Sequence, residues 1–209
     1  MTAPGEWTGR QWARVAMSLA FLLLAAGCAP GMQNVRVELP TYQAPRAARA
    51  AEGRPTVRVE AVKDSRSDSV GSHIGERTTI GNISMGSIEL EPPPTDVIAA
   101  LLRAEFAGMS HGLVKADERF TVAAQLRKFQ VLTPATALYW DLNGAIELDL
   151  SVRSREGRTH EARYAATCTD RTYLFPSEDL IRKVVAACIG RVGESLRGDA
   201  ALAKFMGGP

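Results

Sequence analysis

Cys28 stands directly after a short apolar segment near the N-terminus, and this position makes its thiol a candidate for covalent modification. Arg10 and Arg14 precede an apolar run of twelve residues, 15–26, and small residues stand just before the cysteine. A basic start, a short apolar core and small residues before a cleavage point are typical of a secretory signal peptide. Twelve helical residues span only about 18 Å of the roughly 30 Å hydrocarbon core, so a permanent transmembrane helix is disfavoured.

Residues 24–28, Leu-Ala-Ala-Gly-Cys, resemble the lipobox of bacterial lipoproteins. The resemblance implies diacylation of the Cys28 thiol, cleavage before it and acylation of the new N-terminus, so residues 1–27 would be a lipoprotein signal peptide. Two or three acyl chains anchor a protein stably. Lipoproteins kept at the inner membrane typically carry Asp after the cysteine, whereas this chain has Ala29, which favours the outer membrane. The alternatives are an ordinary signal peptide with an accidental cysteine, or a buried apolar helix.

Charge composition argues against a nucleic-acid partner. The chain has 25 basic and 23 acidic residues among 209, and removal of residues 1–27 leaves the two nearly equal. A chain this close to neutral has neither a steering field for nucleic acid nor a polybasic membrane patch. The 45% share of hydrophobic residues is ordinary for a globular domain, and the mature length suits one domain plus a tether.

The mature chain has two further cysteines, Cys168 and Cys188. An exported domain folds in an oxidising compartment, where two such thiols often pair. A disulfide between them would stabilise the domain by about 3 kcal/mol in the chain-entropy model. Two buried free thiols, one on a strand and one on a helix, are an equal alternative.

No pattern of residues suggests catalysis or metal binding. His73, His111 and His160 lie far apart, without the paired spacing of metal ligands, so we expect surface or turn positions for them. Residues 193–197 lack the final glycine of a nucleophile elbow, and the glycine-rich residues 71–86 lack the Lys-Ser/Thr of a phosphate loop. We therefore predict a protein with no enzymatic activity, cofactor or metal site.

Hydrophobic periodicity predicts an α+β domain over residues 56–199. Alternating apolar residues predict six strands, the longest with an irregularity near Lys128, and an Asn143-Gly144 turn signal follows in a loop. A helix capped by Thr95 and a second that begins at Ser177 each carry an apolar stripe. This order favours a largely antiparallel sheet with two amphipathic helices packed on one face and the other face partly solvated. The strands are expected at residues 56–61, 74–80, 83–90, 120–132, 146–152 and 159–169.

The two ends of the mature chain are expected to lie outside this domain. Residues 28–55 form the lipidated cysteine and a flexible tether, because prolines and glycines punctuate them and they lack a sustained apolar face. Residues 35–39 alternate and would suit a strand, but we assign them to the tether. Residues 200–209 are expected to be a short C-terminal extension.

Several motifs follow one another along the domain: Val57-x-Val59-x-x-Val62-x-Asp64-x-Arg66, Ile74-Gly75, the amphipathic helix of residues 95–106 and Gly198-Asp199. Their ordered combination resembles the YajG-type lipoproteins. The resemblance covers nearly the whole mature domain and implies a small envelope lipoprotein with no established enzymatic activity. The long tether and the loop around residues 139–140 do not belong to the family pattern, and the auxiliary lipoproteins of lipid-transport ABC systems, which begin with a similar strand, are the nearest alternative.

Tyr139 and Trp140 are the candidate partner-binding residues. Aromatic rings in a loop are enriched at interface hot spots, although both rings would instead fold back onto the core in a purely structural role. Together these observations predict a non-enzymatic outer-membrane lipoprotein. Its acylated Cys28 would anchor a periplasmic binding or assembly module for an envelope protein or glycan. The alternative is an auxiliary subunit of a lipid-transport ABC system.

Overall fold

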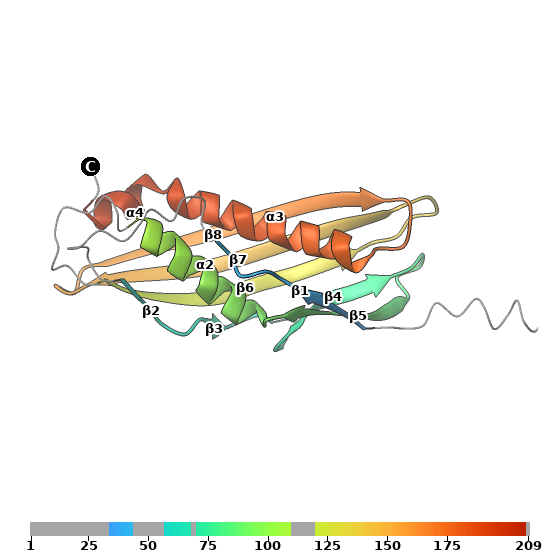
Figure 1. Ribbon diagram of the computed structural model, residues 1–209, viewed down its shortest axis with the longest axis horizontal. Coiled ribbons are helices and arrows are strands. Elements are labelled where there is room, and N and C mark those ends of the chain that lie inside the picture. Colours follow the sequence, from blue (N-terminus) through green and yellow to red (C-terminus); the bar gives the residue numbers. More distant parts are fainter. Residues whose placement is uncertain (1–33, 44–56, 68–69, 110–119, 208–209) are drawn as a thin grey trace, which may run out of the picture. The chain divides into compact units, whose positions relative to one another are not determined.

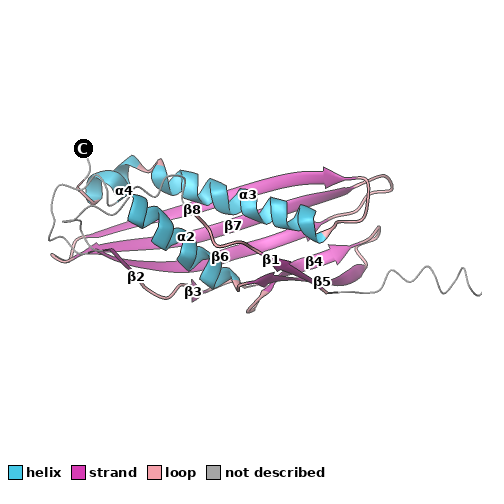
Figure 2. Cartoon of the chain, in the orientation of Figure 1, coloured by secondary structure: helices cyan, strands magenta, loops and turns pink. Residues whose placement is uncertain are grey.

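The computed structural model describes residues 34–43, 57–67, 70–109 and 120–207. These residues form one mixed, mostly antiparallel sheet of eight strands, and the helices α2 and α3 cover one of its faces (Figures 1 and 2). The predicted α+β class is confirmed. The elements are β1 (Val35–Glu38), β2 (Val57–Val59), β3 (Lys63–Asp64), β4 (His73–Thr78), β5 (Ser84–Glu91), α2 (Pro94–Met109), β6 (Phe120–Thr133), β7 (Trp140–Ser154), β8 (Thr159–Thr172), α3 (Glu178–Arg197) and α4 (Ala200–Phe205).

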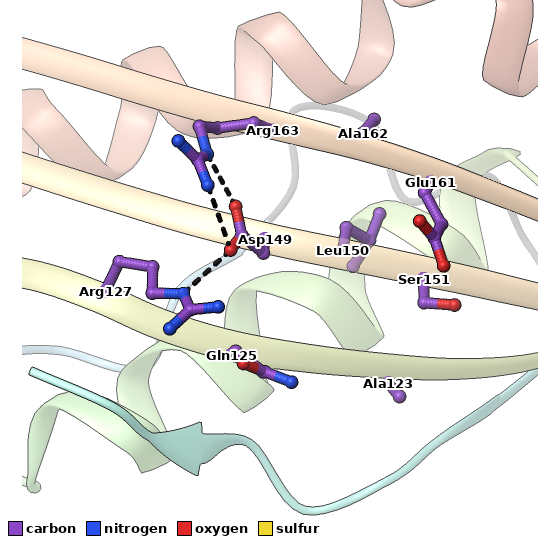
Figure 3. Close-up of a pocket in the computed structure, with 9 residues that line it drawn as sticks. All are labelled: Ala123, Gln125, Arg127, Asp149, Leu150, Ser151, Glu161, Ala162 and Arg163. Atoms are coloured by element: carbon purple, nitrogen blue, oxygen red, sulfur yellow. Dashed lines mark hydrogen bonds and ion pairs between the residues drawn. The ribbon is translucent and has the colours of Figure 1, made fainter.

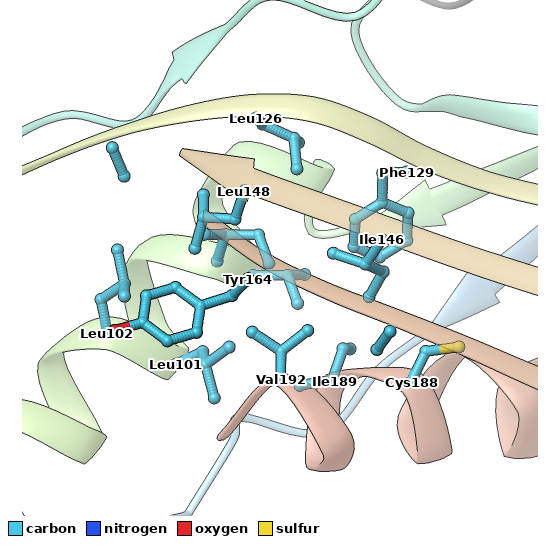
Figure 4. Packing of buried hydrophobic residues seen from close by; sticks show 14 of the residues in the cluster. Leu101, Leu102, Leu126, Phe129, Ile146, Leu148, Tyr164, Cys188, Ile189 and Val192 are labelled. Carbon is cyan, nitrogen blue, oxygen red and sulfur yellow. The ribbon is translucent and has the colours of Figure 1, made fainter. Parts of the chain in front are cut away.

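Three long antiparallel strands, β6, β7 and β8, form one side of the sheet, with β8 at its edge. Alternate side chains of each strand are buried, because successive residues of a strand point to opposite faces of a sheet. The buried set packs under α2 and α3 (Figure 4). The irregularity predicted near Lys128 is confirmed, since the β6–β7 register shifts between Leu126 and Lys128. The opposite face is partly solvated, as the alternation predicted.

The turn predicted at Asn143-Gly144 is wrong. Both residues lie inside β7, where Gly144 pairs with Val131 on one side and Cys168 on the other. A Cβ atom at Gly144 would lie only 2.9 Å from Val184 Cγ1 on α3. The glycine therefore allows α3 to approach the sheet closely. The local sequence does not distinguish a glycine with this role from one that forms a turn.

The two long helices begin at residues suited to that position. Ser177, where the helix start was predicted, caps α3 through its Oγ, which accepts a hydrogen bond from the Leu180 amide. The cap predicted at Thr95 is wrong, because α2 already begins at Pro94, and proline is favoured in the first helical turn. Among the described residues, no helix combines the length and the apolar character needed to span a membrane.

The folded domain begins earlier in the chain than predicted. Val35–Glu38, which we assigned to the tether, form β1 and pair in parallel with β5. Val37 is fully buried in the core, so the strand belongs to the domain and this part of the tether prediction is wrong. The local alternation was visible, but the distant partner strand that makes it a buried strand was not. The remaining tether residues, 28–33 and 44–55, lie outside the described residues.

A polar cluster around the buried Glu105 side chain holds the chain that follows β1. The Tyr42 hydroxyl donates a 2.5 Å hydrogen bond to Glu105 Oε1 on α2, and Arg197 on α3 forms an ion pair with the same oxygen. The Glu105 side chain is only 1% exposed. A Cβ atom at Gly193 would come within 2.6 Å of the Tyr42 hydroxyl, so this glycine of α3 makes room for the contact. We call Tyr42, Glu105 and Arg197 the clamp.

The C-terminal segment is part of the domain and not the extension predicted for residues 200–209. Asp199 caps α4 by accepting hydrogen bonds from the Ala201 and Leu202 amides. Leu202 and Met206 are buried in the core, and the Phe205 ring lies 6.0 Å from that of Phe120. The segment was misassigned because six residues are too short to show a helical period. Residues 208–209 lie outside the described residues.

We expect Glu105→Ala to lower the free energy of unfolding by about 3 kcal/mol, because it leaves the Arg197 guanidinium and the Tyr42 hydroxyl without their shared buried acceptor. Urea unfolding followed by circular dichroism measures the change. Glu161→Ala removes an exposed glutamate from β8 and should have little effect. Equal stability of the two variants would contradict a structural role for the clamp.

Candidate binding surface at one end of the sheet

Three loops meet at the end of the sheet where β4, β6 and β8 finish (Figure 1). They are residues 79–83 between β4 and β5, residues 134–139 between β6 and β7, and residues 173–177 between β8 and α3. The Thr78 amide donates a 2.9 Å hydrogen bond to Thr133 Oγ1, and Trp140 Nε1 donates one of 2.9 Å to the Thr78 carbonyl. We call these three loops, together with Trp140, the apolar end.

The aromatic side chains of the apolar end pack against one another in pairs. The Trp140 ring meets the Phe175 ring edge-on at 5.9 Å, and the Tyr139 ring meets the Tyr173 ring edge-on at 6.4 Å. Tyr139 and Trp140 are therefore half-buried against the loop after β8, outside the main core cluster. This position lies between the two roles considered from sequence, since the rings are held in place yet remain at the surface.

Large apolar side chains are exposed across the apolar end, and charged side chains are absent from its loops. Residues 78–88, 129–140 and 172–177 contain no Asp, Glu, Lys or Arg, whereas the β7–β8 turn at the other end has Arg155, Glu156 and Arg158. A large contiguous patch of exposed apolar side chains commonly marks a site that binds a protein, a ligand or a membrane. The side chains in question, exposed by 37% to 78%, are those of Ile80, Ile83, Leu138, Tyr173, Leu174 and Phe175.

Charged groups begin only at the rim of the apolar end, where Arg171 forms an ion pair with Asp141. Arg171 Nε donates a 2.7 Å hydrogen bond to Asp141 Oδ1, which raises the pKa of the guanidinium, and its Cζ lies 3.8 Å from the Tyr139 ring centroid. Arg77 Cζ lies 4.8 Å from the Phe175 ring centroid, and burial lowers the pKa of Arg77. The arrangement suits contact with an apolar or interfacial partner and lacks a steering charge.

Sequence reasoning identified Tyr139 and Trp140 but missed the residues that complete the surface. The run Tyr173-Leu174-Phe175 stands between a polar strand end and the helix start at Pro176-Ser177, where a loop is normally polar. That contrast was a signal, but only the strand order brings the run beside Trp140.

The helix-free face of the sheet is a second, polar surface (Figure 3). Asp149 on β7 lies between two arginines: its Oδ2 accepts from Arg127 Nε at 2.7 Å and its Oδ1 from Arg163 Nε at 2.6 Å. These bonds, with that to Arg163 first, lower the pKa of Asp149. Small neighbours leave a shallow hollow of about 630 Å³ beside the three charges. Because both arginines are already held by Asp149, this face offers less to a ligand than the apolar end.

The structure brings Cys168 and Cys188 together. Cys168 lies on β8 and Cys188 on α3, and both are buried free thiols. Burial, and next a hydrogen bond with Cys168, raise the pKa of the Cys188 thiol. The disulfide stays a prediction, because the side chains lie in contact but are not bonded. Cys28, the predicted lipidation site, lies outside the described residues.

Two of the three histidines occupy strands and not the surface or turn positions predicted for them. His73 lies half-buried on β4, and His160 on β8 has its ring 5.5 Å from that of Phe205. His111 lies outside the described residues. Across the part of the chain that the structure describes, no three His, Cys, Asp or Glu side chains are grouped so as to hold a metal ion.

The Asp-x-Arg pattern that contributed to the family resemblance has a structural role. Arg66 Nη2 lies 2.8 Å from Asp64 Oδ2, and the guanidinium also donates to the carbonyls of Gly71 and His73 at 2.7 and 2.8 Å. The Arg66 side chain is only 2% exposed, and the bond to Arg66 lowers the pKa of Asp64. The pair therefore closes the connection into β4 and is not available to a ligand.

No protein-family model matches the chain, and no curated protein matches it. Six solved chains are similar in fold. One is protein XCC0632 from Xanthomonas campestris, described as DUF330, with a TM-score of 0.49 and 14% identity over 83% of this chain and 97% of that chain. An uncharacterised protein has a TM-score of 0.42 and 10% identity over 79% and 98%. A neuraminyllactose-binding hemagglutinin homolog from Helicobacter pylori has a TM-score of 0.31 and 9% identity over 80% and 98%.

If the protein is exported to an oxidising compartment, we expect Cys168 and Cys188 to be bonded, because their side chains already lie in contact. Intact mass of the denatured protein should rise by two hydrogens on reduction, and Cys168→Ser with Cys188→Ser should lower the free energy of unfolding by up to about 3 kcal/mol. Alkylation of both cysteines in denatured protein that was never reduced would contradict the bond.

Proposed function

We propose that the protein is a non-enzymatic lipoprotein of the outer membrane, anchored through acylated Cys28. Its α+β domain would face the periplasm as a binding or assembly module. The domain would engage an envelope component through the apolar end. The lipobox-like residues 24–28 support the anchor, and the exposed apolar end supports the binding role.

The observation that carries the binding role is the convergence of three uncharged loops on one end of a rigid sheet. Hydrogen bonds from Thr78 and Trp140 join the loops, and edge-on ring pairs order their aromatic side chains. A surface ordered in this way loses little conformational entropy when it binds, which favours affinity. Tyrosine and tryptophan are also among the residues that contribute most to the free energy of binding at protein interfaces.

The chemistry of the apolar end favours binding over catalysis. Its polar side-chain groups are hydroxyls, the Asn82 amide and the indole N–H, and the two arginines at its edge stack on aromatic rings. General acid–base catalysis needs a titratable group held near neutrality beside a reacting atom, and the loops contribute no carboxylate, histidine or cysteine. Leu174 and its neighbours supply contact area instead.

Photo-crosslinking in cells tests the proposal. A photoreactive residue at Leu174 should capture an envelope component. The same residue at Val70, which is at least as exposed but precedes β4 at the strand end away from the apolar end, should not. Cys28→Ala should reduce capture at Leu174 to the Val70 level, because the domain would lose its anchor.

Equal capture at Leu174 and Val70 would contradict the binding role, and unchanged capture in the Cys28→Ala chain would contradict the anchor. Products that contain an ATPase or a permease would favour the alternative, an auxiliary subunit of a lipid-transport ABC system.

A further inference from the structure

We propose that the apolar end lies in the interfacial layer of the same bilayer that holds the acyl chains of Cys28. The domain would then rest on the membrane surface instead of standing off it. The inference rests on the proposed anchor and names the occupant of the apolar end as phospholipid.

The first argument is the length of chain between the anchor and the fold. Five residues, 29–33, separate Cys28 from Asn34, the first described residue. At no more than about 3.6 Å per residue, Asn34 lies within roughly 20 Å of the acylated cysteine. Residues 35–43 cannot lengthen the link, because β1 pairs with β5 and the clamp holds Tyr42 between α2 and α3.

The second argument is where that link enters the domain. Asn34 Oδ1 accepts a hydrogen bond from the Ser87 amide, and Val35 pairs with Ile88. Because β5 begins at Ser84, just after the turn that carries Ile80 and Ile83, Asn34 lies about 10 Å along the strand from the apolar end. The anchor therefore attaches beside the apolar end, and not beside the charged β7–β8 turn.

The third argument is the chemistry of the surface. Trp and Tyr prefer the level of the lipid headgroups, and leucine side chains reach the acyl boundary below it. The apolar end presents Leu138 and Leu174 beside the two ring pairs. No charge within its loops would lose its hydration there, and the first charged group, Arg171, lies at the rim on the Tyr139 ring.

Tryptophan fluorescence tests the inference, because Trp140 is the sole tryptophan once residues 1–27 are removed; the others are Trp7 and Trp12. The acylated protein is reconstituted in phosphatidylcholine vesicles with or without bromine on the acyl chains, and its mass confirms the acyl groups. Trp140 emission should be quenched in the brominated vesicles. Leu138→Glu with Leu174→Glu, both at exposed positions, should remove the quenching, whereas the matched control Val70→Glu should retain it.

Each outcome decides between the two proposals. Equal Trp140 emission in both vesicle types, with acylation confirmed, would overturn the membrane contact, leave the anchor intact and favour a protein partner for the apolar end. If Val70→Glu also loses the quenching, the result would contradict a membrane contact specific to the apolar end. A mature protein without acyl chains would contradict the proposed anchor and the inference together.

Discussion

The apolar side chains of β6, β7 and β8 that point to one side of the sheet can leave water only beneath α2 and α3, and the rest of the structure depends on this burial. It requires a helix to approach the sheet closely, which Gly144 permits opposite Val184. It leaves the other face to polar side chains such as the Arg127–Asp149–Arg163 group. It also aligns the long strands, so that their connecting loops gather at the two ends.

The N-terminal strand β1 fixes the place at which the preceding chain joins the domain. β1 extends the sheet beyond β5, and the clamp then holds Tyr42 between the two helices that cover the core. Whatever attaches to the chain before Asn34 is thereby connected to one particular edge of the domain. For a chain acylated at Cys28, the short link and the uncharged loops beside it have the same consequence, since both bring the apolar end to the membrane.

The sequence predicted elements with strong, long periods and missed those that depend on distant partners. The three long strands, the bulge near Lys128 and the helix start at Ser177 were predicted because each has a local signature. β1 was missed because only its pairing with β5 buries Val37. Gly144 was misread because a glycine that accommodates a helix resembles one that makes a turn.

The candidate surface was half predictable for the same reason. Tyr139 and Trp140 stood out as adjacent rings in an expected loop. Tyr173 and Phe175 join them only because β7 and β8 pair from Trp140 and Thr172 onward. The uncharged character of all three loops was present in the sequence, but their proximity was not.

Hydrogen–deuterium exchange of the full chain tests the central claim most directly. If the folded domain begins at β1, the Leu39 amide and the other amides of residues 35–39 that face β5 should exchange as slowly as the paired amides of β5. The Leu39 amide donates to the Glu91 carbonyl, and β1 pairs with β5 along its length. Exchange of these amides at the rate of an unstructured peptide would contradict the claim. The link after Cys28 would then be long enough for the domain to stand off the membrane.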